Sequence, residues 1–275
     1  FRSGGHCSAD HHMHNRPISD TGVHVSPVGL GTVKFGRNTH VKYPQKFQIP
    51  NDRSLANLLA TARELGINLL DTAPSYGTSE ARLGQLLKQE RREWVISSKV
   101  GEQYLDGVSR FSFGGDAVRK SVETSLAMLA TDYIDIVLVH SDGNERHIIR
   151  ELDTLDALSR LKDRGTIRCF GVSSKSVEGG LLALEHSDLV MVTYNLNYTA
   201  EETVLNQALA TNKGVFIKKA LASGALSQAE NREGALEDAL SFACKHPAVT
   251  SVIVGTIDGN HLRENVAIVD RNMNP

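Results

Sequence analysis

Four side chains that together could act on a carbonyl group end, or closely follow, three short apolar runs. Asp71 ends "INLLD", and Tyr76 follows it by five residues; Lys99 ends "WVISSK". His140 ends "IDIVLVH". Singly, each has an ordinary reading, such as a helix cap, a solvated lysine or a core histidine. Together they could form a proton donor whose pKa is adjusted by its neighbours. An ammonium lowers the pKa of a nearby phenol, and a carboxylate balances the charge of the buried ammonium. A neutral imidazole orients a C=O group.

The elements that carry these side chains alternate between strand and helix patterns. Runs rich in Val, Ile and Leu, each as long as a fully buried strand, are separated by stretches with apolar residues at i, i+3, i+4 and i+7. This alternation predicts an α/β fold with a parallel sheet, and eight units close a (β/α)8 TIM barrel. A doubly wound sheet is the alternative, but "GLGTVKFG" lacks GxGxxG spacing. The expected strands are 28–33, 67–72, 94–99, 134–140, 167–173, 189–194, 214–220 and 251–256, and the expected helices are 54–65, 79–88, 117–129, 151–162, 176–185, 201–211, 231–245 and 259–269.

The domain prediction is a single barrel over residues 16–275, with 34–53 crossing its mouth. Active sites of such barrels lie at the carboxyl ends of the strands, so the four side chains are expected to converge. Residues 1–15 are read as a flexible arm or an expression remnant, although they hold four of the eleven histidines. The alternative is a metal tract made of His6, Cys7, His11, His12 and His14. We expect no metal and leave this segment out of the fold argument.

Composition excludes several classes of protein. The chain has 275 residues and a formal net charge of -2, with 40% hydrophobic and 23% charged residues, the profile of a soluble globular protein. No basic stripe indicates nucleic acid, and no apolar run reaches the roughly 18 residues of a membrane helix. The cysteines, Cys7, Cys169 and Cys244, form no close pair, so reduced thiols and a cytoplasmic location are expected. Oligomeric state is not predicted.

At these residues the chain resembles the aldo-keto reductases, over about 16–270. "GINLLDTAPSYGTSEARLG" resembles the first signature of the family, "VISSKVG" supplies Lys99 and "DYIDIVLVH" supplies His140. "GVSSKS" and "SVIVGTIDGNHLRENV" resemble its later cofactor-binding motifs. The resemblance implies an NADPH-dependent barrel enzyme, with NADH as the alternative cofactor, that reduces aldehydes or ketones. Hydride would pass from nicotinamide to the carbonyl carbon. Tyr76 would donate the proton, helped by Lys99 and Asp71, and His140 would orient the carbonyl.

The resemblance also implies a nicotinamide site, with two departures from the family pattern. The serine that holds the carboxamide is Ser173, and its usual asparagine neighbour is Ser174 here. A glutamine common in the family is replaced by Met191, which cannot make amide contacts. Carboxamide recognition is therefore expected to shift to the two serines and Asn195. The implied nicotinamide-site residues are Gly31, Thr32, Asp71, Ser173, Ser174, Met191 and Asn195.

The chain also departs from the family pattern at residues implied to lie near the phosphates of the cofactor. Lys218-Lys219 stands where an aromatic residue often stacks on nicotinamide, and one of the pair should face the mouth while the other faces the helices, unless the strand has ended. "LASGAL" resembles the loop over the pyrophosphate, although a plain solvated loop is the alternative. The backbone before the last helix suits the 2′-phosphate of the cofactor. Gly255 and His261 replace the lysine and the arginine that the family often has there, so weak discrimination between NADPH and NADH is expected. The implied residues are Lys218, Lys219, Leu221, Ser223, Gly224, Gly255, Thr256, His261 and Asn265, the last on adenine.

The substrate is expected to be a small carbonyl compound, bound among loops 33–50 and 101–115. Two other functions stay open. A Schiff-base aldolase would use Lys99 as its nucleophile, although Asp71 would keep that lysine charged. A regulatory subunit would bind the cofactor and turn over slowly, although the complete set of four residues argues against it. The aromatic residues of these loops, some of which should wall the pocket, are Phe35, Tyr43, Phe47, Tyr104, Phe111 and Phe113.

Overall fold

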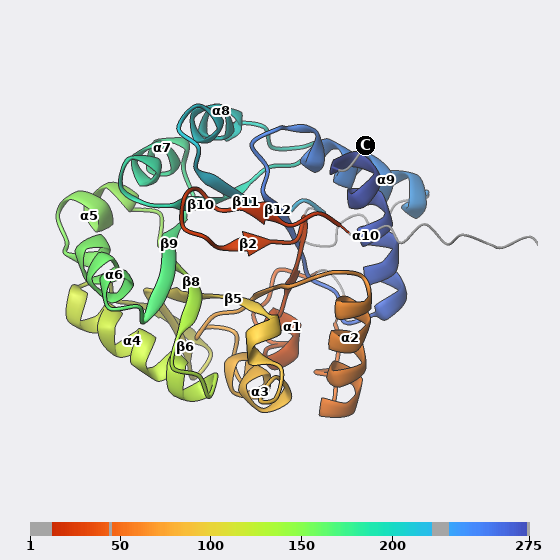
Figure 1. The fold of residues 1–275 in the computed structure, drawn as a ribbon, viewed down its shortest axis with the longest axis horizontal. Helices are drawn as coiled ribbons and strands as arrows, with labels where there is room; N and C mark the ends of the chain where they lie inside the picture. The colour runs from red at the N-terminus through yellow and green to blue at the C-terminus, as the bar shows by residue number, and fades with distance from the viewer. Residues whose placement is uncertain (1–12, 44–45, 222–230, 274–275) are drawn as a thin grey trace, which may run out of the picture.

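Eight parallel strands form a closed barrel, as the strand count predicts (Figure 1). A computed structural model describes residues 13–43, 46–221 and 231–273. Neighbouring strands follow the order β10-β11-β12-β3-β4-β5-β8-β9 around the barrel. The strands are β3 (Val28–Gly31), β4 (Leu69–Asp71), β5 (Val95–Val100), β8 (Ile134–His140), β9 (Ile167–Ser173), β10 (Leu189–Thr193), β11 (Gly214–Lys218) and β12 (Ser251–Val254).

The expected helices surround the barrel. In the first of them, Leu55, Leu58, Leu59 and Ala62 form the buried stripe that the i, i+3, i+4, i+7 pattern predicts. This helix begins two residues earlier than predicted because the side chain of Asn51 accepts a hydrogen bond from the Ser54 backbone N–H at 2.9 Å. The helices are α2 (Asp52–Glu64), α3 (Ser79–Leu86), α4 (Gly115–Met128), α6 (Thr154–Asp163), α7 (Val177–His186), α8 (Glu202–Ala210), α9 (Arg232–Lys245) and α10 (Gly259–Met273).

Several short elements escaped the sequence analysis. The hairpin of β1 (Arg16–Pro17) and β2 (His24–Val25) lies across one end of the barrel, in red at the centre of Figure 1. The segment 101–115 is not a plain loop, because β6 (Glu102–Leu105) and β7 (Val108–Phe111) pair within it as a second hairpin. The remaining short elements are the helices α1 (Val33–Gly36) and α5 (Glu145–Arg150) and the 3-10 turn η1 (Arg91–Glu93).

The strands separate two hydrophobic cores. Along β8, Ile136 and Leu138 pack inside the barrel, whereas Val137 and Val139 pack against the surrounding helices. Ile18 from the first hairpin joins the interior cluster, which fills the barrel toward that end. Because apolar side chains occupy the interior, chemistry is confined to the opposite end, where the strands terminate in polar residues.

Three further observations concern the class of protein expected from the sequence. Across residues 13–43, 46–221 and 231–273, no helix is both long and apolar enough to cross a membrane. Cys169 and Cys244 are buried free thiols. In the same ranges no cluster of His, Cys, Asp or Glu is arranged to hold a metal ion. The histidines proposed as an alternative metal tract lie outside these ranges, apart from His14.

Candidate active site

A cavity of about 850 Å³ opens at the carboxyl ends of the barrel strands. Asp71 from β4, Lys99 from β5 and His140 from β8 line it, and Tyr76 reaches it from the loop after β4. The four residues that the sequence singled out therefore lie around one cavity. Gly31 and Thr32, at the end of β3, line the same cavity beside them.

Lys99 and Asp71 form a buried ion pair at the base of this cavity. The Lys99 ammonium donates to Asp71 Oδ1 at 2.7 Å and to the backbone oxygen of Thr72 at 2.8 Å. The side chains are 2% and 5% exposed, respectively. Burial lowers the pKa of Lys99, but the neighbouring Asp71 and Tyr76 outweigh burial and raise it overall. Lys99 is therefore an ammonium at neutral pH, which argues against a Schiff-base nucleophile.

Tyr76 lies between Lys99 and His140. The Lys99 nitrogen is 4.9 Å from the centre of the Tyr76 ring, and the ring meets His140 edge-on with centroids 6.5 Å apart. Burial raises the pKa of Tyr76, Lys99 lowers it and Asp71 raises it, with a raised value as the result. The lowering by Lys99 is present as predicted, but burial and Asp71 outweigh it. At neutral pH Tyr76 is thus a phenol with a proton to donate.

His140 has a carboxylate neighbour that the sequence analysis missed. Its Nδ1 atom lies 2.8 Å from Glu102 Oε2, although the angle at the contact is outside the range of an aligned hydrogen bond. The other Glu102 oxygen accepts a hydrogen bond from Ser109 Oγ at 2.6 Å. The side chains of His140 and Glu102 are 23% and 14% exposed, respectively.

The hairpin β6–β7 delivers Glu102 to the cavity. Its turn residues, Asp106 and Gly107, have φ values of 53° and 81°, which is the left-handed conformation that a two-residue hairpin turn requires. The Asp-Gly pair is itself a strong hairpin signal, so the sequence contained the clue. What it did not contain is the orientation of the hairpin, which places Glu102 rather than an aromatic side chain against His140.

The serines expected at the nicotinamide carboxamide have different environments. Ser173 Oγ accepts a hydrogen bond from the Lys218 ammonium at 2.9 Å. Ser174 Oγ is buried and has no hydrogen-bond partner within the described part of the chain. Asn195 is engaged, because its amide donates to the Lys219 backbone oxygen at 3.0 Å and accepts from a neighbouring backbone N–H. An unpaired hydroxyl at the cavity wall suits a carboxamide ligand, whereas Asn195 is already used. Met191 lines the cavity as well.

Both lysines of the 218–219 pair line the cavity, because the strand ends between them. β11 stops at Lys218, and Lys219 has a φ of 57°, so the alternation of side chains no longer applies. Burial lowers the pKa of Lys218 to about 7, with Lys219 adding to the shift and Glu201 opposing it. Glu201 is itself buried, and its Oε2 atom has no partner within the described ranges.

The start of α10 differs from the expected phosphate site. The Asp258 carboxylate accepts hydrogen bonds from the backbone N–H groups of Asn260 at 2.7 Å and His261 at 3.2 Å. The donors expected to bind a 2′-phosphate are therefore occupied by a carboxylate. Thr256 Oγ1 accepts from the Asp258 N–H at 3.1 Å, and Asn265 is buried near this end of α10.

The segment 34–53 reaches the mouth of the barrel, as expected. Tyr43 lines the cavity, and a Cβ atom added to Gly255 would lie 2.7 Å from its hydroxyl. A side chain at that position would therefore require the Tyr43 hydroxyl to move. Of the other loop aromatics, Phe35 and Phe113 are buried in the core rather than at the cavity. Leu221 packs beside the core, and Ser223 and Gly224 lie outside the described residues.

The sequence pattern that defines the aldo/keto reductase family matches residues 27–239. The chain belongs to this family. A solved structure assigned to the aldo-keto reductases from Pseudomonas aeruginosa is 49% identical, with a TM-score of 0.85 over 94% of this chain and 95% of that one. L-galactose dehydrogenase of Arabidopsis thaliana is 28% identical over 92% of this chain and 87% of its own length. The NADH-specific methylglyoxal reductase of Escherichia coli is 30% identical over 75% of this chain and 66% of its own.

Proposed function

We propose that this aldo-keto reductase reduces the carbonyl of a small aldehyde or ketone to an alcohol, with a reduced nicotinamide cofactor as the hydride source. The observation that carries the proposal is the placement of Tyr76 between the buried Lys99–Asp71 pair and His140 at the mouth of the barrel. A protonated phenol beside a fixed ammonium is a proton donor whose anion is stabilised as soon as the proton leaves.

The roles of the four residues follow from their contacts. When bound, the cofactor supplies hydride to the carbonyl carbon. Tyr76 donates its proton to the oxygen that gains charge, and Lys99 stabilises the resulting phenolate. Asp71 keeps Lys99 charged and in place through the 2.7 Å contact. His140 orients the substrate oxygen from the opposite side of Tyr76, and the apolar interior beneath Met191 excludes water from the base of the cavity.

We assign the nicotinamide end of the cofactor to Ser173, Ser174 and Asp71 beside Gly31 and Thr32. The unpaired Ser174 hydroxyl supports this assignment. For the other end we propose that NADPH binds with weak preference over NADH. Gly255, His261 and the carboxylate of Asp258 at the start of α10 remove cationic support for a 2′-phosphate. One relative is an NADH-specific reductase by name, which is consistent with weak discrimination between the two cofactors.

Fluorescence titration with NADPH and with NADH, followed by addition of 4-nitrobenzaldehyde, tests the proposal. The wild-type chain should bind a reduced cofactor and oxidise it when the aldehyde is added. Tyr76→Phe should bind the cofactor equally well but turn over roughly 10²- to 10⁴-fold more slowly, the usual contribution of a positioned proton donor.

Other outcomes of this titration point elsewhere. Failure to bind either nucleotide would contradict the proposed function. Binding by both proteins without turnover on a panel of aldehydes would favour the regulatory subunit instead. Borohydride trapping of an aldehyde on Lys99 would favour the aldolase, which the Lys99–Asp71 pair makes the least expected result.

A further inference from the structure

The side chain of Lys218 reaches across a neighbouring strand of the barrel. In the barrel order, β10 lies between β9, which ends at Ser173, and β11, which ends at Lys218. Side chains alternate along a strand, so Lys218 lies on the same side of β11 as Phe216, which packs inside the barrel. Lys218 Nζ donates to Ser173 Oγ at 2.9 Å and to the Ser174 backbone oxygen at 2.7 Å. The lysine therefore spans the width of β10 at the mouth of the barrel.

The residue of β10 between these two strands is Met191. It is the register partner of Ser173 on β9 and of Phe216 on β11, and it packs inside the barrel. A thioether donates no hydrogen bond and accepts only weakly, in contrast to the glutamine that the family often has there. Lys218 therefore brings a hydrogen-bond donor to a part of the cavity wall where Met191 offers none.

Lys218 and Ser173 each keep a donor for a ligand. An ammonium has three N–H groups, and Lys218 uses two of them within the described ranges. Ser173 Oγ accepts from Lys218, so its own hydrogen is directed elsewhere, and no acceptor for it lies among the described residues. Both residues line the cavity. The ligand group that fits two converging donors is an oxygen with two lone pairs, such as that of a carbonyl.

We propose that Lys218 is a cofactor-binding residue that, together with the Ser173 hydroxyl, donates to the carboxamide oxygen of the nicotinamide and replaces the amide side chain absent at Met191. This inference rests on the proposed function and refines how that site recognises its cofactor. In the reduced cofactor the ring nitrogen shares its electron pair with this oxygen, which makes the oxygen a better acceptor. The oxidised ring carries a positive charge that an ammonium repels. Lys218 should therefore favour binding of the reduced form.

The binding of a cofactor fragment isolates this contact. Titrations at pH 6.5, where Lys218 is mainly an ammonium, compare NADPH with 2′-phospho-ADP-ribose, which has the same phosphates and adenosine but no nicotinamide. In Lys218→Met, Kd for NADPH should rise by about tenfold more than Kd for the fragment, the loss of one hydrogen bond. NADH and ADP-ribose form the corresponding pair. Equal rises for the two ligands, or none, would overturn the proposal.

Lys219→Met is the matched control. Lys219 also lines the cavity, but within the described ranges it donates no hydrogen bond to Ser173 or Ser174. Its charge acts on phosphates that both ligands carry, so any rise in Kd should be the same for NADPH and for the fragment. A rise confined to NADPH would show that general positive charge, rather than the Lys218 contact, holds the nicotinamide, and it would overturn the proposal.

A cofactor analogue identifies the atom that Lys218 contacts. The reduced 3-acetylpyridine analogue keeps the carbonyl oxygen of the carboxamide but has a methyl group in place of the NH2 group. Lys218→Met should raise Kd for this analogue by the same factor as Kd for NADPH. A clearly smaller rise would assign the contact to the NH2 group and would contradict the proposal.

A double variant tests the exchange of roles between the two strands. Lys218→Met/Met191→Gln restores an amide on β10, and Kd for NADPH should return to within about threefold of the wild type, with Kd for the fragment unchanged. A folded double variant without this recovery would show that the two positions do not serve the same contact. Urea unfolding checks that each variant is folded, and the double variant provides a second route if Lys218→Met is not.

The failure of this inference differs from the failure of the proposed function. If the wild type binds neither NADPH nor NADH, the proposed function fails. If the wild type binds and oxidises a cofactor but Lys218→Met weakens NADPH and the fragment equally, only the role of Lys218 is wrong.

Discussion

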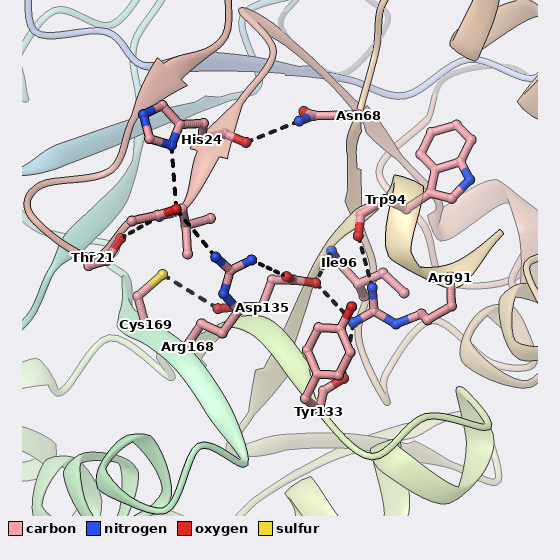
Figure 2. A network of polar contacts seen from close by, with 12 residues as sticks. Thr21, His24, Asn68, Arg91, Trp94, Ile96, Tyr133, Asp135, Arg168 and Cys169 are labelled. Atoms are coloured by element: carbon pink, nitrogen blue, oxygen red, sulfur yellow. Dashed lines mark hydrogen bonds and ion pairs between the residues drawn. The ribbon is translucent and has the colours of Figure 1, made fainter.

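The two ends of strand β8 each carry an ionisable side chain, and their surroundings differ sharply. At the end beside the first hairpin, Asp135 is buried and its carboxylate is fully engaged (Figure 2). One oxygen accepts from Arg91 at 2.9 Å and from the Ile96 backbone N–H at 3.0 Å, and the other accepts from Arg168 at 3.0 Å. Arg168 also donates to the Gly22 backbone oxygen at 3.2 Å, which ties the hairpin to the barrel.

At the other end, polar groups are left incompletely paired. His140 contacts Glu102 at a poor angle, and the buried oxygens Ser174 Oγ and Glu201 Oε2 have no partner in the residues described. Lys218 is partly buried beside a second lysine, and within the described ranges its ammonium donates only to a hydroxyl and a carbonyl oxygen. Buried polar groups normally find partners, so groups without them indicate a place where a ligand supplies the partners.

Polar groups at the hairpin end of β8 stabilise the fold, whereas polar groups at the mouth of the barrel are available to bind a ligand. Asp135 stabilises the barrel because both of its carboxylate oxygens accept hydrogen bonds. The incompletely paired residues at the mouth, unlike the Lys99–Asp71 pair, cost stability in the unliganded chain, and their contribution comes with binding and catalysis. Substitutions at the two ends should therefore change different measured quantities.

Lys99→Met should have the largest effect at the mouth. Without the ammonium, the phenolate of Tyr76 loses its stabilising charge, and kcat should fall roughly 10²- to 10⁴-fold. The variant should also lose about 3 kcal/mol of unfolding free energy, because Asp71 is left buried and unpaired. Steady-state kinetics and urea unfolding measure the two losses. The double variant Lys99→Met/Asp71→Asn should regain stability but not activity; recovery of both would show that Lys99 has only a structural role.

Asp135→Asn tests the opposite end. It should lower the unfolding free energy by about 3 kcal/mol, because Arg91 loses the partner of its buried charge. The value of kcat per folded molecule should stay within about twofold of the wild type, since Asp135 lies at the far end of the barrel from the cavity. Urea unfolding and active-site titration provide the measurements. Arg168→Met is the milder control and should cost about 1 kcal/mol or less, because Arg168 is 43% exposed. A large loss of kcat in Asp135→Asn would contradict the division between the two ends.

Lys218→Met should change how the binding of the oxidised cofactor depends on pH. The pKa of Lys218 is depressed to about 7, so the lysine is charged below that pH and neutral above it. A charged lysine repels the cationic nicotinamide of the oxidised cofactor, so Kd for NADP⁺ should fall by about threefold as pH rises from 6 to 8, a difference of under 1 kcal/mol. In Lys218→Met the same Kd should not change with pH. Calorimetric titration at pH 6 and pH 8 measures this Kd. If the Kd still changes with pH in Lys218→Met, the effect belongs to another group.

The same depressed pKa has a consequence for stability. Between pH 7 and the ordinary pKa of lysine near 10.5, the unfolded chain binds a proton at Lys218 that the folded chain does not. Stability conferred at this position therefore rises with pH over that window. The pH dependence of urea unfolding should be shallower in Lys218→Met, which checks the sign independently of the cofactor.

Asp258→Ser should have the smallest effect. Serine retains a cap for the start of α10 but removes the negative charge from the expected 2′-phosphate site. The ratio of NADH to NADPH dissociation constants should shift toward NADPH by about two- to fivefold, in line with the modest energy of a charge at a helix end. Parallel fluorescence titrations measure the ratio. An unchanged ratio would place the 2′-phosphate away from this helix.

Much of the fold and of the candidate site could be predicted from the sequence. The strand runs and the 3.6-residue stripes of the helices report which residues face a core, and these patterns are local. Asp71, Lys99 and His140 were found because a parallel barrel brings all strand ends to one face. The two short hairpins were missed because their strands are only two to four residues long, too short for a periodic signal.

The chemistry of the mouth depended on the three-dimensional arrangement. Glu102 reaches His140 only because its hairpin folds over the cavity, and no spacing along the chain reports that orientation. The net shift in the pKa of Tyr76 also required the structure, because burial and the charges of Lys99 and Asp71 oppose one another. The sequence by itself determined which residue types stand at the strand ends. Only the tertiary structure decided their protonation, because desolvation and charge–charge distances depend on how distant segments pack.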